Sequence, residues 1–458
     1  MPRSPKVVVV GLDCLAPDLV FDRLRGELPN FNALMESGEW GPLESVDPPI
    51  TVPAWACMLS GRAPAELGLY GFRHRKLGSY DERYFATSEH VRLPRVWDRL
   101  AEAGLESGLL GVPQTWPVKA MKGWCALDFQ TPSAAPGWAW PPELEQEIAN
   151  PRFDVEKLRS GDLARIREDV FALSTQRFEL FRELLARRGA DFAMMVDISP
   201  DRVHHAFWRY FDEKHPRFEP WSEFAKVIPD FYRHLDAQLA KTLEALPHDV
   251  HLFVVSDHGA QAMEGGFALN DWLVREGYLV LKRPAVGPRA FDEKLVDFGR
   301  TKAWGWGGYC GRLFVNLQGR EPDGQVPPSQ YEWLLSEIAA KLEAISFPRS
   351  TSSTPSTSST SSTPSTTVMR PSDLGPGVPQ GDWPDLLFYP AGLRYRAIAS
   401  VGNPGLFTQT NDTGPDDANH AKQGVFLYRG PGVAAGRREG LKLLDVAPRL
   451  LSLFGLTA

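Results

Sequence analysis

The chain has 458 residues, 43% of them hydrophobic, and its 50 Lys and Arg against 57 Asp and Glu give a formal net charge of −7. This balance is typical of a globular protein and excludes wholesale disorder, a coiled coil and a collagen-like fibre. Because the chain has neither a basic excess nor a Lys/Arg tract, we expect it to bind no nucleic-acid polymer and no anionic membrane.

The apolar run near the N-terminus covers only 7–10, which is too short for a signal peptide or a membrane span. No run of about 18 apolar residues occurs elsewhere, so we expect no membrane-spanning helix. The cysteines lack a CxxC spacing, which argues against a disulfide framework. We therefore expect a cytoplasmic protein.

Strand and helix patterns alternate along the chain. Continuous apolar runs predict buried strands at 7–10, 107–112, 191–196, 251–255, 386–389 and 425–428. Composition and apolar spacing predict helices at 53–59, 93–103, 160–188, 201–210, 225–245 and 443–453. This order predicts an α/β fold with a central, mostly parallel sheet, in which sites gather beyond the carboxyl ends of the strands.

Two segments differ in composition from the rest. Residues 113–155 are rich in Trp, Pro and Ala and have the irregular pattern of an insertion or lid. Residues 350–367 are all Ser, Thr or Pro, which predicts a disordered loop; a modification tract is the alternative. Because the strand pattern returns after this tract, we predict one domain over 1–458, with insertions at about 113–155 and 270–380.

Carboxylates and imidazoles stand where predicted strands end or in adjacent segments. They are Asp13 after the first strand, Asp257 and His258 after the strand at 251–255, Asp201 and His205 four residues apart on one helix face, and His420 before the strand at 425–428. Taken singly, each has an ordinary structural alternative, such as a helix cap, a surface pair or a turn. Together they favour a site with enough oxygen and nitrogen ligands for two Zn²⁺-like ions.

Thr51 is the candidate nucleophile, because it lies just before Pro53 at the predicted start of a helix. The positive end of the helix dipole favours an alkoxide or a bound phosphate there. A coordinated metal ion would lower the pKa of the hydroxyl further. The alternative is that Thr51 is a simple helix N-cap.

The segments that carry these residues are 49–55, 59–62, 68–72, 201–208, 255–259 and 420–424. In this order they resemble the motifs of the type I phosphodiesterase/nucleotide pyrophosphatase family, which belongs to the alkaline phosphatase superfamily. Residues 301–304 and 315–322 are similar to a segment typical of prokaryotic members. The resemblance covers roughly 7–345 and 380–455, and its ordered set of motifs is more specific than any one of them.

The resemblance implies an alkaline-phosphatase-like α/β sandwich with inserted lid segments and a two-metal site. One divalent ion, Zn²⁺ or Mn²⁺, would be held by Asp13, Thr51, Asp257 and His258. The other would be held by Asp201, His205 and His420. The implied activity is hydrolysis of a small-molecule phosphoester, most readily a diester, through a phospho-threonine at Thr51.

The substrate is less well defined by the resemblance. Nucleotide pyrophosphatases carry a His-Gly pair and then an Asn after the nucleophile segment, where this chain has Leu67-Gly68 and Phe72, so a nucleotide is only one option. An apolar wall for the substrate is expected from Trp55, Phe72 and the aromatic residues of 304–309. Contacts with anionic oxygens are expected from Arg62, Arg73 and Lys302. Core packing and solvated surface charge are the ordinary alternatives for these residues.

Other activities remain open within the superfamily. A phosphomonoesterase or a phosphomutase would use the same metal ligands. A sulfatase would need Cys or Ser at the nucleophile position and Arg at residue 55, where this chain has Trp55. A non-catalytic binding relative is disfavoured, because every expected ligand and nucleophile position holds a competent side chain.

Overall fold

The computed structural model describes residues 3–132, 135–348, 366–376 and 380–457. The loop predicted at 350–367 lies outside these residues apart from its last two, and Thr367 begins a strand. No helix in the described ranges is both long enough and apolar enough to cross a membrane.

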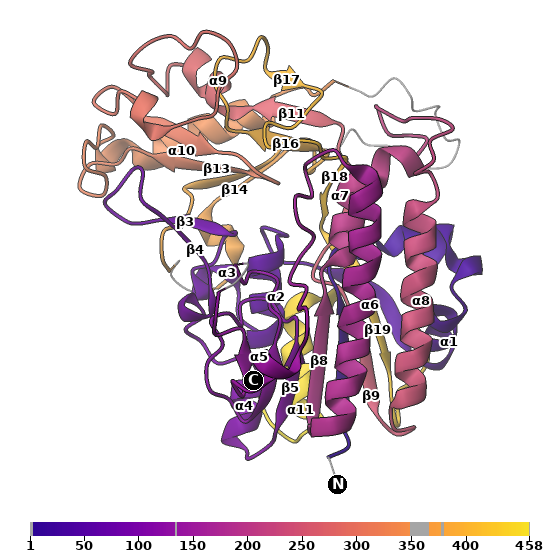
Figure 1. Ribbon diagram of the computed structural model, residues 1–458. Helices are drawn as coiled ribbons and strands as arrows, with labels where there is room; N and C mark the ends of the chain where they lie inside the picture. Colours follow the sequence, from indigo (N-terminus) through magenta and orange to yellow (C-terminus); the bar gives the residue numbers. More distant parts are fainter. Residues whose placement is uncertain (1–2, 133–134, 349–365, 377–379, 458) are drawn as a thin grey trace.

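A ten-stranded sheet forms the larger part of the molecule (Figure 1). Its strands lie in the order β20 (Gly436–Arg437), β2 (Glu39–Glu44), β19 (Gln423–Arg429), β9 (His251–Val255), β1 (Val7–Leu12), β8 (Phe192–Asp197), β5 (Ser107–Leu110), β6 (Gly123–Ala126) and β7 (Ala139–Trp140), with β21 (Leu441–Lys442) also paired to β2. The central strands β9, β1, β8, β5 and β6 are parallel, whereas β19 runs antiparallel to β9. This confirms the predicted α/β fold with a mostly parallel sheet.

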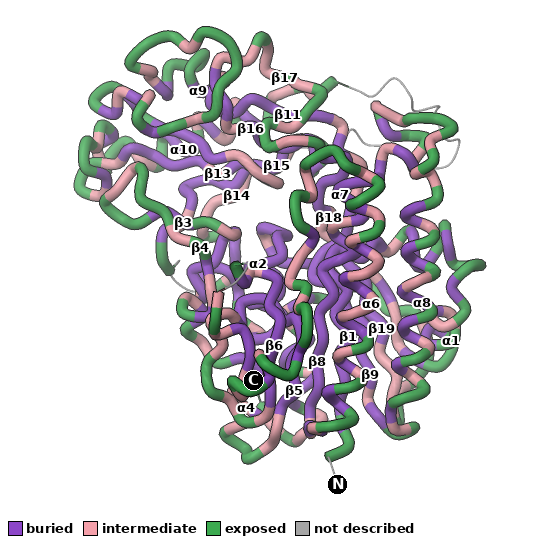
Figure 2. Tube along the Cα trace, viewed as in Figure 1, coloured by how far each residue is buried: buried purple, intermediate pink, exposed green. Residues whose placement is uncertain are grey.

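Helices cover both faces of this sheet, as a parallel sheet requires. One face packs against α1 (Pro29–Ser37), α6 (Leu163–Arg188), α7 (Ser199–Phe211) and α8 (Val227–Ala245), and the other against α2 (Thr51–Ser60), α4 (Val96–Glu102) and α11 (Val446–Ser452). Along β1, Val8 and Val10 join the first core while Val7 and Val9 join the second, because successive side chains of a strand point to opposite faces. Figure 2 shows these strands buried.

A smaller part lies beyond the carboxyl ends of the central strands (Figure 1). It contains a four-stranded antiparallel sheet of β12 (Ala303–Trp306), β13 (Gly311–Val315), β15 (Leu386–Tyr389) and β14 (Thr367–Met369), a three-stranded sheet of β16 (Tyr395–Ile398), β11 (Gly265–Ala268) and β17 (Phe407–Thr408), and the helices α9 (Leu269–Arg275) and α10 (Pro328–Glu343). Two antiparallel strands connect the parts: β10 (Gly259–Ala262) leads from the central sheet into the smaller part, and β18 (Ala418–Ala421) leads back to the central sheet. The strand predicted at 386–389 is β15, which belongs here and not to the central sheet.

The remaining elements are short. They are α3 (Pro64–Leu67), β3 (Arg73–Arg75), β4 (Arg83–Phe85), α5 (Leu144–Glu147), one π turn at Leu19–Arg23, and 3₁₀ turns at Arg25–Glu27, Ser88–His90, Glu293–Leu295, Pro371–Leu374 and Leu443–Asp445. The segment 113–155, expected to be irregular, also supplies β6 and β7 to the edge of the central sheet.

A buried arginine joins the β3–β4 hairpin to the smaller part. The Arg75 guanidinium donates to both oxygens of Glu321 at 3.1 Å and to Asp382 at 2.7 and 3.0 Å. All three side chains are buried, so removal of one partner would leave an uncompensated charge. The hairpin that follows the nucleophile segment is therefore fixed against the smaller part.

The same hairpin contains a buried neutral histidine. The Nε2 atom of His74 accepts the Tyr70 N–H at 2.9 Å, and its ring stacks on Tyr84. Burial lowers the pKa of His74 to about 3, below the ordinary value for histidine.

This shift predicts a loss of stability in acid. The unfolded chain takes up the His74 proton near pH 6.5 and the folded chain only near pH 3. The contribution of neutral His74 to the free energy of unfolding is therefore full above about pH 6.5 and falls as the pH drops toward 3. The free energy of unfolding, measured by urea denaturation between pH 7.5 and 4, should therefore fall less steeply for His74→Gln than for the wild type, by at most about 1.4 kcal/mol per pH unit. Identical pH dependence in the two proteins would contradict this assignment.

Candidate active site

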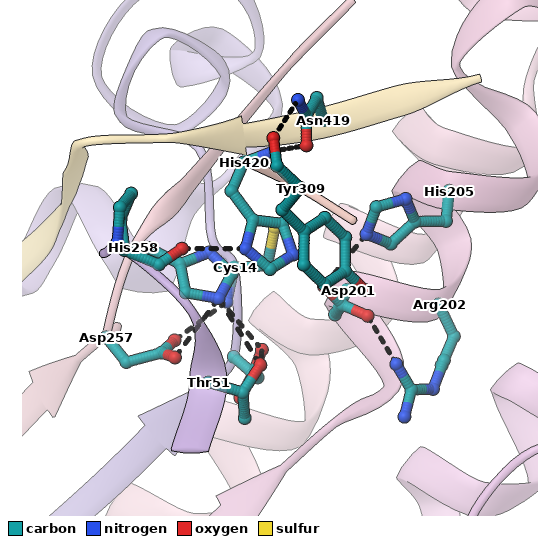
Figure 3. Close-up of polar contacts among 12 residues, drawn as sticks. Cys14, Thr51, Asp201, Arg202, His205, Asp257, His258, Tyr309, Asn419 and His420 are labelled. Carbon is teal, nitrogen blue, oxygen red and sulfur yellow. Dashed lines mark hydrogen bonds and ion pairs between the residues drawn. The ribbon is translucent and has the colours of Figure 1, made fainter. Parts of the chain in front are cut away.

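The predicted ligand and nucleophile residues meet at the carboxyl ends of the central strands (Figure 3). Asp13 follows β1, Asp257 and His258 follow β9, Asp201 and His205 lie on α7 directly after β8, His420 lies on β18, and Thr51 is the first residue of α2. Because β1, β8 and β9 are adjacent and parallel, their ends reach the same edge of the sheet. All seven side chains are buried.

A first cluster surrounds the Thr51 hydroxyl. Its Oγ1 atom lies 3.5 Å from Asp13 Oδ1 and 3.4 Å from His258 Nε2. His258 Nε2 lies 3.2 Å from Asp257 Oδ2, and the Cys14 N–H donates to the other oxygen of Asp257 at 3.2 Å. Asp13, Asp257 and His258 together have the spacing of a metal-binding group.

A second cluster adjoins the first. Asp201 Oδ1 lies 3.2 Å from His205 Nε2, one helical turn away, and 3.4 Å from His420 Nε2. These three residues also have the spacing of a metal-binding group. The rings of His258 and His420 stack with centroids 3.8 Å apart, so the clusters share a wall of imidazoles.

Each of the three histidines is anchored through Nδ1. His258 Nδ1 lies 3.1 Å from the Gly259 carbonyl oxygen, and His420 Nδ1 lies 2.7 Å from the Pro49 carbonyl oxygen. His205 Nδ1 lies 2.7 Å from Asp416 Oδ1. Since these oxygens accept, Nδ1 carries the hydrogen and Nε2 faces the clusters as the atom available to a metal ion, the arrangement expected of metal-ligating histidines.

Several of the inward-facing atoms lack hydrogen bonds. Among the described residues, no hydrogen-bond partner exists for the buried atoms Asp201 Oδ1, His205 Nε2, Asp257 Oδ2 and His420 Nε2. Buried polar atoms without partners are costly, and a cation in each cluster would satisfy them. The donor set of carboxylate oxygens and imidazole nitrogens therefore fits two divalent metal ions.

The first cluster is also short of positive charge. Burial raises the pKa of Asp13 well above its ordinary value, and the charge of Asp201 raises it further. Burial and then the charge of Asp13 raise the pKa of Asp257 in the same way. Burial, followed by the His420 charge, lowers the pKa of His258. A cation at this position would reverse the unfavourable interactions among the carboxylates.

The second cluster is partly neutralised by the protein itself. Burial would lower the pKa of His205, but Asp416 and Asp201 outweigh it and raise this pKa to about 9. Burial would raise the pKa of Asp201, but the charge of His205 outweighs it and lowers this pKa. The other oxygen of Asp201 accepts from Arg202 at 2.5 Å.

Asp416 is a functional candidate that no pattern in the sequence marks. It lies in the polar loop before β18, and the fold alone brings it to His205. Its second oxygen is held by Arg159 at 3.0 Å and by Arg396, so the carboxylate is fixed from both sides. Asp416 therefore fixes the orientation of the His205 imidazole through Nδ1.

Trp55 lies in the core and not on a substrate-facing wall. It is one helical turn after Thr51, is fully buried, and its indole N–H donates to Asp13 Oδ2 at 2.7 Å. The ring passes so close to β1 that a Cβ atom on Gly11 would lie 2.6 Å from it, which explains the glycine inside this strand. Trp55 therefore holds Asp13 in place.

Arg62 and Lys302 are not brought to the clusters. Arg62 follows the C-terminal end of α2, opposite Thr51, where it lines a cavity of about 250 Å³ with Arg95 and Arg99. Lys302 is exposed and precedes β12. Both residues lie next to a motif in the sequence but away from the clusters in space, because α2 separates Arg62 from Thr51 and β12 separates Lys302 from Tyr309.

Two aromatic residues from the expected wall do lie near the clusters. Phe72 packs edge-on against Phe129, whose ring lies under the Arg202 guanidinium. Tyr309 stacks on His420 with ring centroids 3.6 Å apart. Trp304, by contrast, is buried in the core of the smaller part.

Comparisons with known proteins agree with this geometry. The family model for type I phosphodiesterase / nucleotide pyrophosphatase matches residues 7–413. No curated protein sequence matches the chain significantly. Solved structures similar to the chain include human ectonucleotide pyrophosphatase / phosphodiesterase 5, with a TM-score of 0.54 and 15% identity over 99% of this chain and 96% of that one.

Two further structures bear on the fold. Phosphonoacetate hydrolase from Sinorhizobium meliloti, in complex with phosphonoformate, has a TM-score of 0.58 and 15% identity over 97% of this chain and 94% of that one. A complex of murine ectonucleotide pyrophosphatase / phosphodiesterase 5 with AMP has a TM-score of 0.51 and 14% identity over 99% and 96% of the two chains. The family match over most of the chain shows that it belongs to the type I phosphodiesterase / nucleotide pyrophosphatase family and is a metal-dependent phosphoester hydrolase.

Proposed function

We propose that the chain is a two-metal phosphodiesterase in which Thr51 is the nucleophile and becomes transiently phosphorylated. The observation that carries this proposal is the position of Thr51 Oγ1, buried between Asp13 and His258 at the first residue of α2. A hydroxyl that only capped the helix would have no need of a carboxylate and an imidazole beside it.

The residues divide into two ligand sets. Asp13, Thr51, Asp257 and His258 would hold one divalent ion. Asp201, His205 and His420 would hold the other, with Zn²⁺ the best match to the donors and Mn²⁺ the alternative. When bound, such ions lower the pKa of the hydroxyl and neutralise charge on the transferring phosphoryl group.

The protein residues set up an in-line displacement. The free N–H groups and positive dipole end of α2 receive the anionic phosphoryl group beside Thr51. The Thr51 oxygen forms a bond to phosphorus while the bond to the alcohol oxygen breaks, which leaves a phospho-threonine that still carries the second ester substituent. The Thr51 hydroxyl gives up its proton to solvent, and the departing alcohol oxygen takes one from solvent. Water then attacks phosphorus, the bond to Thr51 breaks, and the monoester product departs with the hydroxyl restored.

A small diester is the substrate that we favour. Phe72 and Phe129 supply apolar surface beside Arg202, where the second ester substituent would rest. The murine relative that binds AMP makes a nucleotide one candidate. The departures at Leu67 and Phe72 from the nucleotide pyrophosphatase pattern leave other diesters equally open.

The first test compares bis-p-nitrophenyl phosphate with p-nitrophenyl phosphate, with Zn²⁺ or Mn²⁺ added and with a chelator as control. We expect turnover that prefers the diester and disappears on chelation, because both ligand sets act on the same phosphoryl group. Preference for the monoester would instead assign a phosphatase. No turnover with either metal would contradict the proposal.

Substitution of the nucleophile gives the second test. Thr51→Ala should lower kcat by roughly a thousandfold or more, whereas Thr51→Ser keeps a hydroxyl and should retain measurable turnover. Metal content by elemental analysis should stay near the wild-type value, since Asp13, Asp257 and His258 remain. Full chelator-sensitive turnover in Thr51→Ala would show that another group attacks phosphorus.

The anchoring of His205 gives the third test. Asp416→Asn removes the charged acceptor from His205 Nδ1 and should weaken metal binding or activity by roughly 10- to 100-fold. Asp417→Asn is the matched control, because its carboxylate pairs with Arg217 and Arg209 and does not hold the imidazole. Metal affinity is measured by competition with a chelator. Equal losses in the two variants would indicate a general effect of the loop.

A further inference from the structure

Tyr309 reaches the site from the smaller part of the molecule. It follows β12, and the preceding Gly308 exchanges two backbone hydrogen bonds with Ala397 on β16, at 2.9 and 3.2 Å. Asn419 on β18 donates its side-chain N–H to the Tyr309 carbonyl at 3.0 Å and accepts the N–H of His420 at 3.0 Å. The tyrosine and the metal-ligand strand are thus held in one fixed arrangement (Figure 3).

The ring and its hydroxyl have different surroundings. The ring stacks on His420 at 3.6 Å and lies 5.5 Å from His205, while the Arg396 guanidinium covers it at 4.3 Å. The residue is partly buried, and among the described residues the hydroxyl makes no hydrogen bond; the one hydrogen bond to Tyr309 is that of Asn419 to its carbonyl. Arg202 pairs with Asp201 Oδ2, and Arg396 pairs with Asp416, so neither arginine binds the phenol.

A partnerless phenol beside the second ligand set points to a substrate contact. The set of Asp201, His205 and His420 adjoins the Thr51 cluster through the stacked rings of His258 and His420, so in the proposed displacement by Thr51 it would face the leaving oxygen. A tyrosine hydroxyl is protonated at neutral pH and can donate to an oxygen that gains negative charge. Such donors act mainly where charge develops in the transition state.

We propose that Tyr309 donates a hydrogen bond to the leaving-group oxygen and so favours esters whose alcohols leave poorly. This inference rests on the proposed function of the same site. As the bond between phosphorus and the leaving oxygen breaks, its electron pair stays on that oxygen, which the phenol stabilises. The oxygen takes its proton from solvent after departure, and Tyr309 remains a phenol throughout.

The test compares wild type and Tyr309→Phe on diesters that differ only in their leaving alcohol: p-nitrophenol, phenol and an aliphatic alcohol, in order of rising pKa. The loss of kcat/KM should grow along this series, from less than about threefold to roughly 10- to 100-fold, because the hydrogen bond strengthens with the charge on the oxygen. Metal content and melting temperature should match the wild type, since phenylalanine keeps the stacking on His420.

Two further variants separate the hydroxyl from the ring. Tyr309→Ala loses both, whereas Tyr395→Phe is a matched control whose hydroxyl bonds the Pro348 carbonyl at 3.0 Å in the smaller part. A Tyr309→Phe enzyme with the wild-type dependence on leaving group, beside an impaired Tyr309→Ala, would overturn the inference and assign Tyr309 a packing role. If the wild type hydrolyses no phosphoester with any metal, the proposed function fails and this inference fails with it.

Discussion

The anchoring of three imidazoles through their Nδ1 atoms is the interaction on which the site depends. Gly259, Pro49 and Asp416 each take the Nδ1 hydrogen of one histidine, so that every Nε2 atom points into the clusters. Imidazoles held in this orientation can bind a metal ion through Nε2 without first reorganising. Because Pro49 lies two residues before Thr51, the bond to it also ties His420 to the turn that leads into α2.

The central sheet supplies the precision that this anchoring requires. Three adjacent parallel strands deliver a carboxylate or an imidazole from the residues that follow them, and the valines of β1 lock that strand between two cores. Trp55 then fixes Asp13 from the opposite face, through a hydrogen bond that needs a glycine at position 11. The site is rigid because its ligands belong to the elements with the most extensive packing.

The smaller part contributes side chains to the site. It sends Tyr309 onto His420 and Arg396 onto Asp416, while the buried Arg75 ion pairs hold the hairpin after the nucleophile helix against it. In the proposed mechanism, the nucleophile and most of the metal ligands come from the central sheet and its helices, and substrate contacts arise where the two parts meet. Substrate preference can therefore change through the smaller part, because its loops can vary without altering the ligand set on the central sheet.

The sequence by itself determined the class of fold and the main buried strands and helices, and it marked the carboxylates and imidazoles that the fold brings together. It could do so because strand ends and helical spacing are local features of the chain. Only the tertiary structure decided the partners of those side chains. Asp416 and Tyr309 contact the imidazoles from segments that are distant in the sequence. Trp55 binds Asp13 instead of lining a substrate wall, and Arg62 lies at the far end of α2 from Thr51. Such contacts depend on how elements pack, and no spacing in the chain encodes that packing directly.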